Sequence, residues 1–417
     1  MFHRMKRKSE FTRNVLTLMT GTAIAQAIPI AISPILTRIY SPEEFGIFAL
    51  YLSVASIPAI IATGRYELAI MLPKKDEDAI YITLASIGIS FFVSLIVLFI
   101  VSAFNTEIAV LLDNTEISKW LYFIPITVFF TGVYKSINFW FNRKKEYKNI
   151  ATSKVYQSSI AGGSSLSLGF SGFQHIGLIF GNLIGQIFAT SYFVNIFYRK
   201  YKAKIRFNRL KSYALLRKYK KFPILNMLNA LIDSLRLAGI NILIAKYYSL
   251  STLGQFSLAW RMVQMPISIL SSSMSQVFYQ KINGLSNQEL YRYTVKFVIQ
   301  LSITALLPFL LIFIFAQDLF EIFFGEKWTQ AGSIASILTP WLYVNFISSP
   351  LSIVAMKIGK HEISLITSVV YMATPLSILY YFQNSDINYV LNLIVYAMVI
   401  ILMVYIAIIL FKLRERI

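Results

Sequence analysis

The sequence predicts an all-helical polytopic membrane protein with about twelve transmembrane helices, arranged as two six-helix bundles around a central polar cavity. The first observation is composition: 56% of the 417 residues are hydrophobic and only 14% are charged, whereas a soluble protein carries roughly 25% charge. The second is a series of long apolar runs, each near the ~20 residues that cross a bilayer. The third is a concentration of basic residues in alternate connecting segments. Together they exclude a soluble enzyme, a disordered chain and a fibrous repeat.

The first apolar run, residues 15–38, follows a basic segment, and Ala25-Gln26-Ala27 resembles a signal-peptidase site. We expect no cleavage, because the run is too long for the apolar core of a signal peptide. Pro29 and Pro34 interrupt it, which a membrane helix tolerates where neighbours satisfy the freed backbone groups. The remaining expected spans are 45–72, 79–103, 117–137, 150–170, 174–198, 222–245, 253–277, 295–316, 330–354, 362–382 and 387–411.

The charges predict the orientation. There are 39 Lys and Arg against 19 Asp and Glu, and most of the basic residues lie in alternate connecting segments. The loops on the other side carry only Arg38, Lys119, Lys246 and Lys327 and are otherwise acidic. The positive-inside rule therefore places both termini in the cytoplasm. Residues 199–221 are strongly basic without an acidic residue, so they anchor the orientation and could also attract anionic lipid headgroups.

An internal repeat predicts the domain organisation. The segment from Thr37 to Leu50 reads TRIYSPEEFGIFAL, and Ala245 to Leu258 reads AKYYSLSTLGQFSL, with Gly46 matching Gly254. We expect an N-terminal bundle at 1–198, a basic cytoplasmic linker at 199–221 and a C-terminal bundle at 222–417. Six spans in each half preserve the orientation of the repeat, so its axis should lie along the membrane normal.

Ionisable and polar residues inside the expected spans mark the candidate site. Charges in a bilayer are costly and indicate function by default. Polar residues at helical spacing share one face of a helix and predict a polar cavity. The nine residues expected to bind substrate are Arg65, Glu67, Lys135, Lys154, Asn229, Asp233, Arg236, Arg261 and Gln264.

The charge of this set predicts an anionic ligand, because five of its members are cations and two are anions. Arginine suits phosphate, since its planar fork donates two parallel hydrogen bonds. Two structural interpretations compete. Lys135 and Lys154 lie near inner span ends and could extend to the interface. Arg65 with Glu67, and Asp233 with Arg236, could be structural ion pairs. Arg261 has no acidic neighbour in sequence, which favours a functional role.

Other features narrow the function. There is no cysteine and the three histidines are scattered, so we expect no catalytic or metal site. The chain has no phosphate-binding loop that would indicate direct ATP drive. Gly177, Gly181 and Gly185 form a Gly-x-x-x-Gly series typical of close helix packing. The aromatic residues are expected mostly at the lipid interface.

Two segments resemble the polysaccharide-transporter branch of the multidrug/oligosaccharidyl-lipid/polysaccharide (MOP) exporter superfamily, and the O-antigen flippases of the Wzx group in particular. They are GTAIAQAIPIAISPILTRIYSPEEFGIFAL, from Gly21 to Leu50, and RYELAIMLP, from Arg65 to Pro73. The resemblance implies a MATE-like fold in the bacterial plasma (inner) membrane. It also implies a flippase, not an enzyme, that moves an undecaprenyl-pyrophosphate-linked oligosaccharide to the outer leaflet for surface polysaccharide synthesis.

We expect no bound cofactor. A proton or sodium gradient could supply the energy for transport. The expected partners are the lipid-linked oligosaccharide, the bilayer and a polysaccharide polymerase or other assembly proteins, with no nucleic acid. One alternative is a multidrug antiporter of the same superfamily, whose cationic substrates would favour an acidic cavity. Another is a membrane glycosyltransferase or polymerase, which would need a large outer loop or a carboxylate site.

Overall fold

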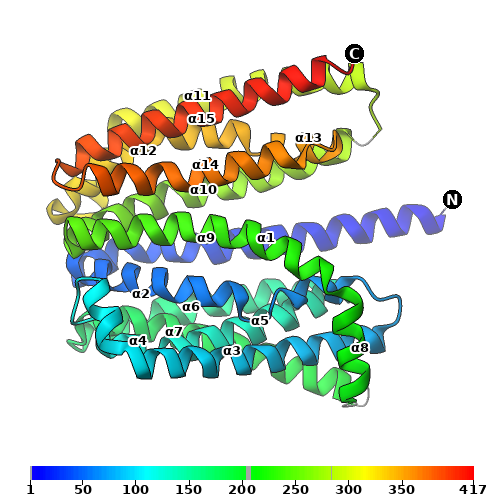
Figure 1. Ribbon diagram of the computed structural model, residues 1–417, viewed down its shortest axis with the longest axis horizontal. Helices are drawn as coiled ribbons and strands as arrows, with labels where there is room; N and C mark the ends of the chain where they lie inside the picture. Colours follow the sequence, from blue (N-terminus) through cyan, green and yellow to red (C-terminus); the bar gives the residue numbers. More distant parts are fainter. Residues whose placement is uncertain (1, 203–207, 283) are drawn as a thin grey trace. The chain divides into compact units, whose positions relative to one another are not determined.

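The computed structural model describes residues 2–202, 208–282 and 284–417 (Figure 1). Within these ranges the secondary structure is helical and no strand occurs. The helices of the first half are α1 (Phe2–Ile39), α2 (Pro42–Ile61), η1 (Tyr66–Met71), α3 (Asp76–Leu111), α4 (Ser118–Leu121), α5 (Ile124–Arg143), α6 (Tyr147–Phe170), α7 (Gln174–Tyr201) and α8 (Arg209–Tyr219). Those of the second half are α9 (Lys221–Tyr247), α10 (Leu250–Ile282), α11 (Asn287–Phe324), η3 (Glu326–Trp328), α12 (Thr329–Ser348), α13 (Leu351–Lys357), α14 (His361–Tyr381) and α15 (Ile387–Arg414).

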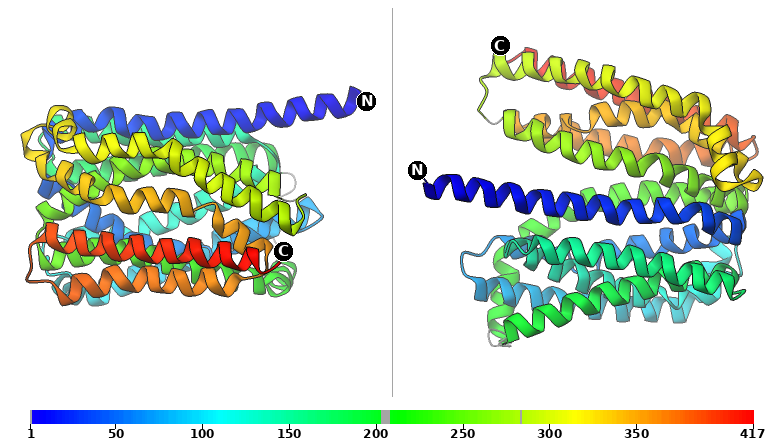
Figure 2. Two further views of the ribbon diagram at one scale, coloured as in Figure 1. Left: turned by 90° about the horizontal axis from the view of Figure 1, so that it is seen from above. Right: turned by 180° about the vertical axis from the view of Figure 1, so that it is seen from behind.

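The fold is that of a multi-pass membrane protein. Among the described residues, nine helical segments are long and apolar enough to cross a membrane. They cover α1, α2, α3, α5, α7, α11, α12, α14 and α15. The remaining predicted spans, 150–170, 222–245 and 253–277, fall on α6, α9 and α10, which are long enough to cross a membrane. The number twelve is thus consistent with the fold and stays a prediction. Figure 2 shows the long helices from two further directions.

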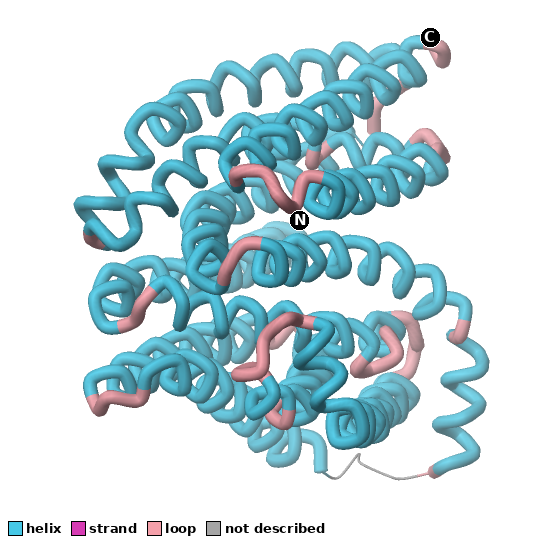
Figure 3. The backbone as a smooth tube through the Cα atoms, turned by 60° about the vertical axis from the view of Figure 1, so that its left-hand side comes forward, coloured by secondary structure: helices cyan, strands magenta, loops and turns pink. Residues whose placement is uncertain are grey.

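The chain forms two compact units. The first contains Met1–Tyr40 and Ile47–Ser234, and the second contains Ser41–Gly46 and Leu235–Ile417. Short connections join most helices within each unit, as the tube in Figure 3 shows. The division falls inside α9, between Ser234 and Leu235. The short segment 41–46 belongs to the first half of the sequence but packs in the second unit.

The second predicted span, 45–72, is wrong as one continuous helix, because α2 ends at Ile61. Gly64 and Arg65 follow with φ angles of 57° and 61°, and η1 then begins at Tyr66. Two successive left-handed residues cannot continue a right-handed helix. The predicted spans 117–137 and 330–354 are similarly divided, into α4 with α5 and α12 with α13.

The glycine series on α7 packs against α6, as predicted. A Cβ atom on Gly181 would lie 2.1 Å from the Ser165 Oγ, and one on Gly185 would lie 2.6 Å from the Gln157 carbonyl oxygen. Both distances are too short for any side chain without a shift. The glycines therefore let the backbones of α6 and α7 approach closely, as small residues do in membranes.

The repeat-related glycines make reciprocal contacts inside the second unit. A Cβ atom on Gly46 would lie 1.9 Å from the Leu250 carbonyl oxygen, and one on Gly254 would lie 1.7 Å from the Pro42 carbonyl oxygen. Gly254 follows Gly46 by 208 positions, and Leu250 follows Pro42 by the same number. The first turns of α2 and α10 thus pack on each other. A shift of 208 positions converts the Gly46–Leu250 contact into the equivalent Gly254–Pro42 contact.

Candidate substrate-binding clusters

The break after α2 holds a buried carboxylate. We call Thr63, Arg65, Glu67 and Lys135 the Glu67 cluster. Glu67 is 1% exposed, its carboxylate accepts a hydrogen bond from the Thr63 hydroxyl, and the Arg65 Nη1 lies 3.4 Å from its Oε1. Lys135 on α5 donates to the Ala59 carbonyl oxygen at 3.0 Å and lies within electrostatic range of Glu67 and Arg65.

The Glu67 cluster has an excess of positive charge. It contains two cations and one carboxylate, and the Arg65 Nε is buried without a hydrogen-bond partner. Burial of a charge is costly unless it is paired. The Arg65 side chain is 20% exposed, so its guanidinium can bind Glu67 and still offer donors to an anion. The structure brings together Arg65, Glu67 and Lys135, which were predicted on two different spans.

A second group lies in the second unit. We call Arg236, Trp341, Asn345 and Tyr371 the Arg236 cluster. The Arg236 guanidinium carbon lies 4.8 Å from the centre of the Tyr371 ring. The Trp341 Nε1 donates to the Tyr371 hydroxyl at 2.5 Å, and that hydroxyl lies 3.4 Å from the Asn345 Oδ1. Contacts of this cation–π kind contribute roughly 0.5–2 kcal/mol.

The Arg236 cluster leaves donors available. Arg236 Nε and Nη1 are buried and have no hydrogen-bond partner among the described residues. A guanidinium carries five N–H donors in a fixed fork, so the ring of Tyr371 satisfies only its charge. An unsatisfied buried donor costs about 1–3 kcal/mol. An anionic or hydroxyl-rich ligand at this position would supply the missing acceptors.

Arg261 and Gln264 lie on α10, close in sequence to this aromatic group. The Trp260 ring lies 5.2 Å from the Trp341 ring and is stacked on Phe256. Arg261 is half-buried and forms no ion pair within the described part of the chain. The Gln264 Oε1 is buried without a hydrogen-bond donor. This stretch of α10 therefore offers a cation and an acceptor one turn apart.

The remaining candidates are placed apart from these groups. Lys154 on α6 donates to the Thr22 hydroxyl of α1 at 3.1 Å. Asp233 is exposed, and no ion pair joins it to Arg236 in the residues that the structure covers. The structural interpretation of Asp233 and Arg236 as an ion pair is therefore wrong, and the Arg236 guanidinium instead lies over the Tyr371 ring of α14. The side chain of Asn229 lies outside the described residues.

Part of the polar surface of α5 serves helix packing. The Tyr51 hydroxyl lies 2.6 Å from the Thr127 Oγ1, and the Gln186 Nε2 donates to the Thr127 carbonyl oxygen at 3.1 Å and to the Thr131 Oγ1 at 2.5 Å. These bonds link α2, α5 and α7 within the first unit. Polar residues commonly join helices in this way in membranes. Thr127 and Thr131 of α5 are therefore bonded to neighbouring helices.

The two clusters contain residues that were not predicted from the sequence as site residues, among them Trp341, Tyr371 and Thr63. The aromatic residues were expected mostly at the lipid interface, whereas Trp341 is 1% exposed. A signal was present: Trp341 lies well inside α12 and follows Pro340, away from the helix ends where interfacial aromatics concentrate. Thr63 could have been found from its position four residues before Glu67.

Comparison with known proteins places this geometry in context. The profile of a family described as polysaccharide biosynthesis protein matches residues 35–333. No curated protein sequence matches the chain.

Solved structures show the same fold. The chain is similar to the lipid II flippase MurJ in an inward closed conformation, with a TM-score of 0.75 and 15% identity over 96% of this chain and 87% of that one. It is also similar to an inward-facing multidrug resistance MATE transporter of the MOP superfamily, with a TM-score of 0.72, 14% identity and coverage of 96% and 98%. A MOP superfamily transporter from Pyrococcus furiosus gives a TM-score of 0.63 and 14% identity over 97% and 95%.

Proposed function

Because the chain belongs to the polysaccharide biosynthesis protein family, we propose that it flips an undecaprenyl-pyrophosphate-linked oligosaccharide from the cytoplasmic to the outer leaflet of the bacterial plasma membrane, by alternating access. Such a substrate carries many hydroxyls and about two negative charges on its pyrophosphate. Each unpaired polar group costs several kcal/mol in hydrocarbon, so the substrate needs a polar path. No covalent chemistry is required, in keeping with a family of transporters.

The observation that carries the proposal is the set of arginine donors without protein partners. Arg236 keeps two buried nitrogen atoms without a hydrogen-bond partner and Arg65 keeps one, while Arg261 forms no ion pair within the described structure. A pyrophosphate presents several oxygen acceptors, and arginine binds phosphate bidentately. The partly exposed rings of Trp260 and Tyr371 provide flat apolar surfaces suited to the carbon–hydrogen faces of sugar rings, and the buried Trp341 contacts both of them.

Complementation of a flippase-null strain tests the proposal. Arg261→Ala and Arg236→Ala should each abolish surface polysaccharide while protein levels in the membrane stay unchanged. Arg261→Lys should retain partial transport, because the charge is kept and the fork geometry is lost. Arg217→Ala is the matched control, since Arg217 is an exposed arginine on α8. Normal polysaccharide from both alanine variants would reject the anion site.

The same fold carries multidrug transporters, so an antiporter of organic cations is the second candidate. An antiporter of organic cations would need a negatively charged site, because cations bind carboxylates, whereas the flippase needs a positively charged one. Drug susceptibility of a strain expressing the chain distinguishes the two. Resistance that depends on Glu67 or Asp233, without any change in surface polysaccharide, would favour the antiporter over the flippase.

The energy source and partners belong to the same proposal. We infer that a proton or sodium gradient drives the cycle, without a bound cofactor, and that Glu67 and Asp233 are the carboxylates available for exchange. Both termini would lie in the cytoplasm, and a polysaccharide polymerase or other assembly proteins would receive the product. Transport measured in vesicles with an imposed proton or sodium gradient would separate the two ions.

A further inference from the structure

A shallow groove on α11 carries two cations beside apolar side chains. Its volume is about 470 Å³, and its lining residues are Tyr291, Arg292, Val295, Lys296, Ile299 and Gln300. The volume falls in the range of roughly 300–1,000 Å³ that is typical of ligand sites. The groove lies outside the Glu67 and Arg236 clusters, and the proposed transport cycle does not use it.

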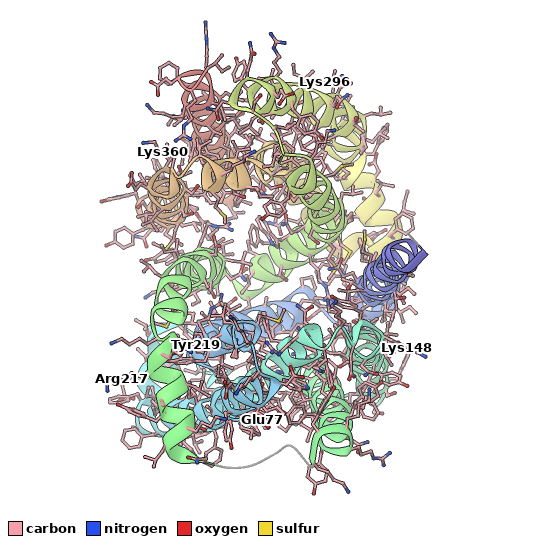
Figure 4. All side chains as sticks on the ribbon, turned by 90° about the vertical axis from the view of Figure 1, so that its right-hand side faces the viewer. Glu77, Lys148, Arg217, Tyr219, Lys296 and Lys360 are labelled. Atoms are coloured by element: carbon pink, nitrogen blue, oxygen red, sulfur yellow. The ribbon has the colours of Figure 1, made fainter. Side chains whose placement is uncertain are left out.

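The other face of this part of α11 is held by the second unit. Leu290 and Thr294 are buried. Phe278 of α10 stacks with Tyr293 at 5.8 Å between ring centroids and makes a tilted ring contact with Phe297 at 4.5 Å. These contacts fix the rotation of α11 about its axis. Arg292 and Lys296 are consequently exposed on the groove face (Figure 4, where Lys296 is labelled).

Arg292 and Lys296 form a pair of positive charges without a carboxylate partner among the described residues. They are four positions apart, so their side chains are neighbours on the helix surface. The nearest acidic residue in sequence, Glu289, is engaged elsewhere: its Oε2 accepts hydrogen bonds from the Ser286 backbone N at 2.9 Å and from the Ser286 hydroxyl at 2.8 Å. Two like charges held together favour an anion between them.

An exposed apolar stripe continues from the groove along α11. Ile299, Ile303, Leu306 and Leu307 are 52–70% exposed. From Lys296 to Leu306 the helix rises about 15 Å at 1.5 Å per residue, which is half of the ~30 Å hydrocarbon core. The stretch from Lys296 to Leu306 is therefore about as long as one leaflet, with the two cations at its polar end, and exposed apolar residues continue beyond it to Phe323.

We propose that this groove binds one anionic phospholipid of the bilayer, with the headgroup phosphate between Arg292 and Lys296 and an acyl chain along Ile299, Ile303 and Leu306. The ligand chemistry follows from the order of the groups: a doubly cationic end with a tyrosine beside it, followed by an apolar track at least as long as one leaflet. Such a lipid would hold α11 at a fixed depth and rotation in the membrane.

Native mass spectrometry of the purified full-length chain tests this proposal. Delipidated protein is titrated with phosphatidylglycerol or with zwitterionic phosphatidylcholine. The wild type should bind the first phosphatidylglycerol much more tightly than phosphatidylcholine. The double variant Arg292→Gln with Lys296→Gln should weaken that first site by roughly thirtyfold, because each basic residue near a membrane surface contributes about 1 kcal/mol.

Lys148→Gln supplies the matched control. Lys148 is an exposed lysine at the start of α6 (Figure 4) and does not line the groove, so its replacement should leave the first site unchanged. Equal affinity of the double variant and the wild type would overturn the proposal. So would an equal loss in the Lys148 variant, which would indicate a general charge effect, or tighter first binding of an isoprenyl phosphate than of phosphatidylglycerol, which would indicate a different lipid class.

Discussion

At the scale of single residues, Arg65 combines a positive φ of 61° with a side chain that binds Glu67. A non-glycine residue in this region costs of order 1 kcal/mol or more, and its side chain here provides a compensating ion pair. We predict that Arg65→Gly is more stable than Arg65→Ala by about 1 kcal/mol. Both changes remove the same charge, and only glycine accepts the backbone without strain. Thermal unfolding of the two variants in one detergent measures the difference.

The matched comparison is at a position with ordinary helical backbone. Arg261→Gly should be less stable than Arg261→Ala, because glycine costs about 1 kcal/mol relative to alanine inside a helix. The sign of the glycine–alanine difference should therefore reverse between residues 65 and 261. The same sign at both positions would show that the turn after α2 does not hold Arg65 in the left-handed region.

At the scale of helix pairs, the contact of α6 with α7 depends on glycine. We predict that Gly181→Ala lowers the unfolding temperature, because the new Cβ would lie 2.1 Å from the Ser165 Oγ and 2.8 Å from the Ser165 backbone N. Overpacking of this kind costs about 1–3 kcal/mol. Gly163→Ala on α6 is the control, since no atom lies within 4 Å of a Cβ there. A thermal shift assay in detergent that gave equal losses for both would contradict close packing at Gly181.

The link between α6 and α7 at their other ends is ionic. Glu146 precedes α6 and accepts hydrogen bonds from Lys200 at 2.8 Å, Tyr201 at 2.6 Å and Asn149 at 2.5 Å. Burial acts to raise the pKa of the Glu146 carboxyl, but the hydrogen bonds from Lys200, Tyr201 and Asn149 outweigh it and hold this pKa below its ordinary value.

A carboxyl with a lowered folded-state pKa contributes stability above its unfolded pKa of about 4.3 and loses it as the pH falls through the folded value. Glu146→Gln should therefore lower stability by about 0.5–1 kcal/mol at pH 7, a modest figure because Lys200 is half-exposed. The difference from the wild type should shrink as the pH falls below 4. Melting curves at pH 7 and at about pH 3, below the unfolded pKa of the carboxyl, test this. A difference that grew in acid would contradict the ionic link.

At the scale of the whole molecule, the distribution of charge predicts which ends of the helices face the cytoplasm. Because the chain has no cysteine, single cysteines report without background. We predict that a cysteine at Asn114 or Asn384 reacts with a membrane-impermeant thiol reagent in intact cells. A cysteine at Ser212 should react only after the cells are opened. Labelling of the Ser212 variant in intact cells would reject the orientation.

Hydropathy predicts the helices well, because it is local information. It misses the end of α2 at Ile61, since Ala62 to Leu72 is apolar enough to read as a continuous span, although Gly64 marks the break. The cost of a charge in a bilayer makes Arg236 a candidate, and spacing along the helix suggests Asp233 as a possible partner. Asp233 is near in sequence, whereas Tyr371 is 135 positions away and is brought close only by packing of α14. Spacing along one helix cannot predict such a choice.

The contact of Gly46 with Leu250 and of Gly254 with Pro42 bears on whether the two halves can find each other as separate chains. The segment 41–46 is covalently part of the first half, yet its packing partners lie in the second. We expect fragments 1–220 and 221–417, when produced together, to co-purify. The reason is that segment 41–46 of the first fragment has its packing partners in the second fragment. Gly254→Leu should prevent this capture, whereas Gly284→Leu, where no atom lies within 4 Å of a Cβ, should permit it. A covalent connection would then be dispensable for assembly. Gly46 and Gly254 would make the two fragments recognise each other, because only glycine permits this close contact.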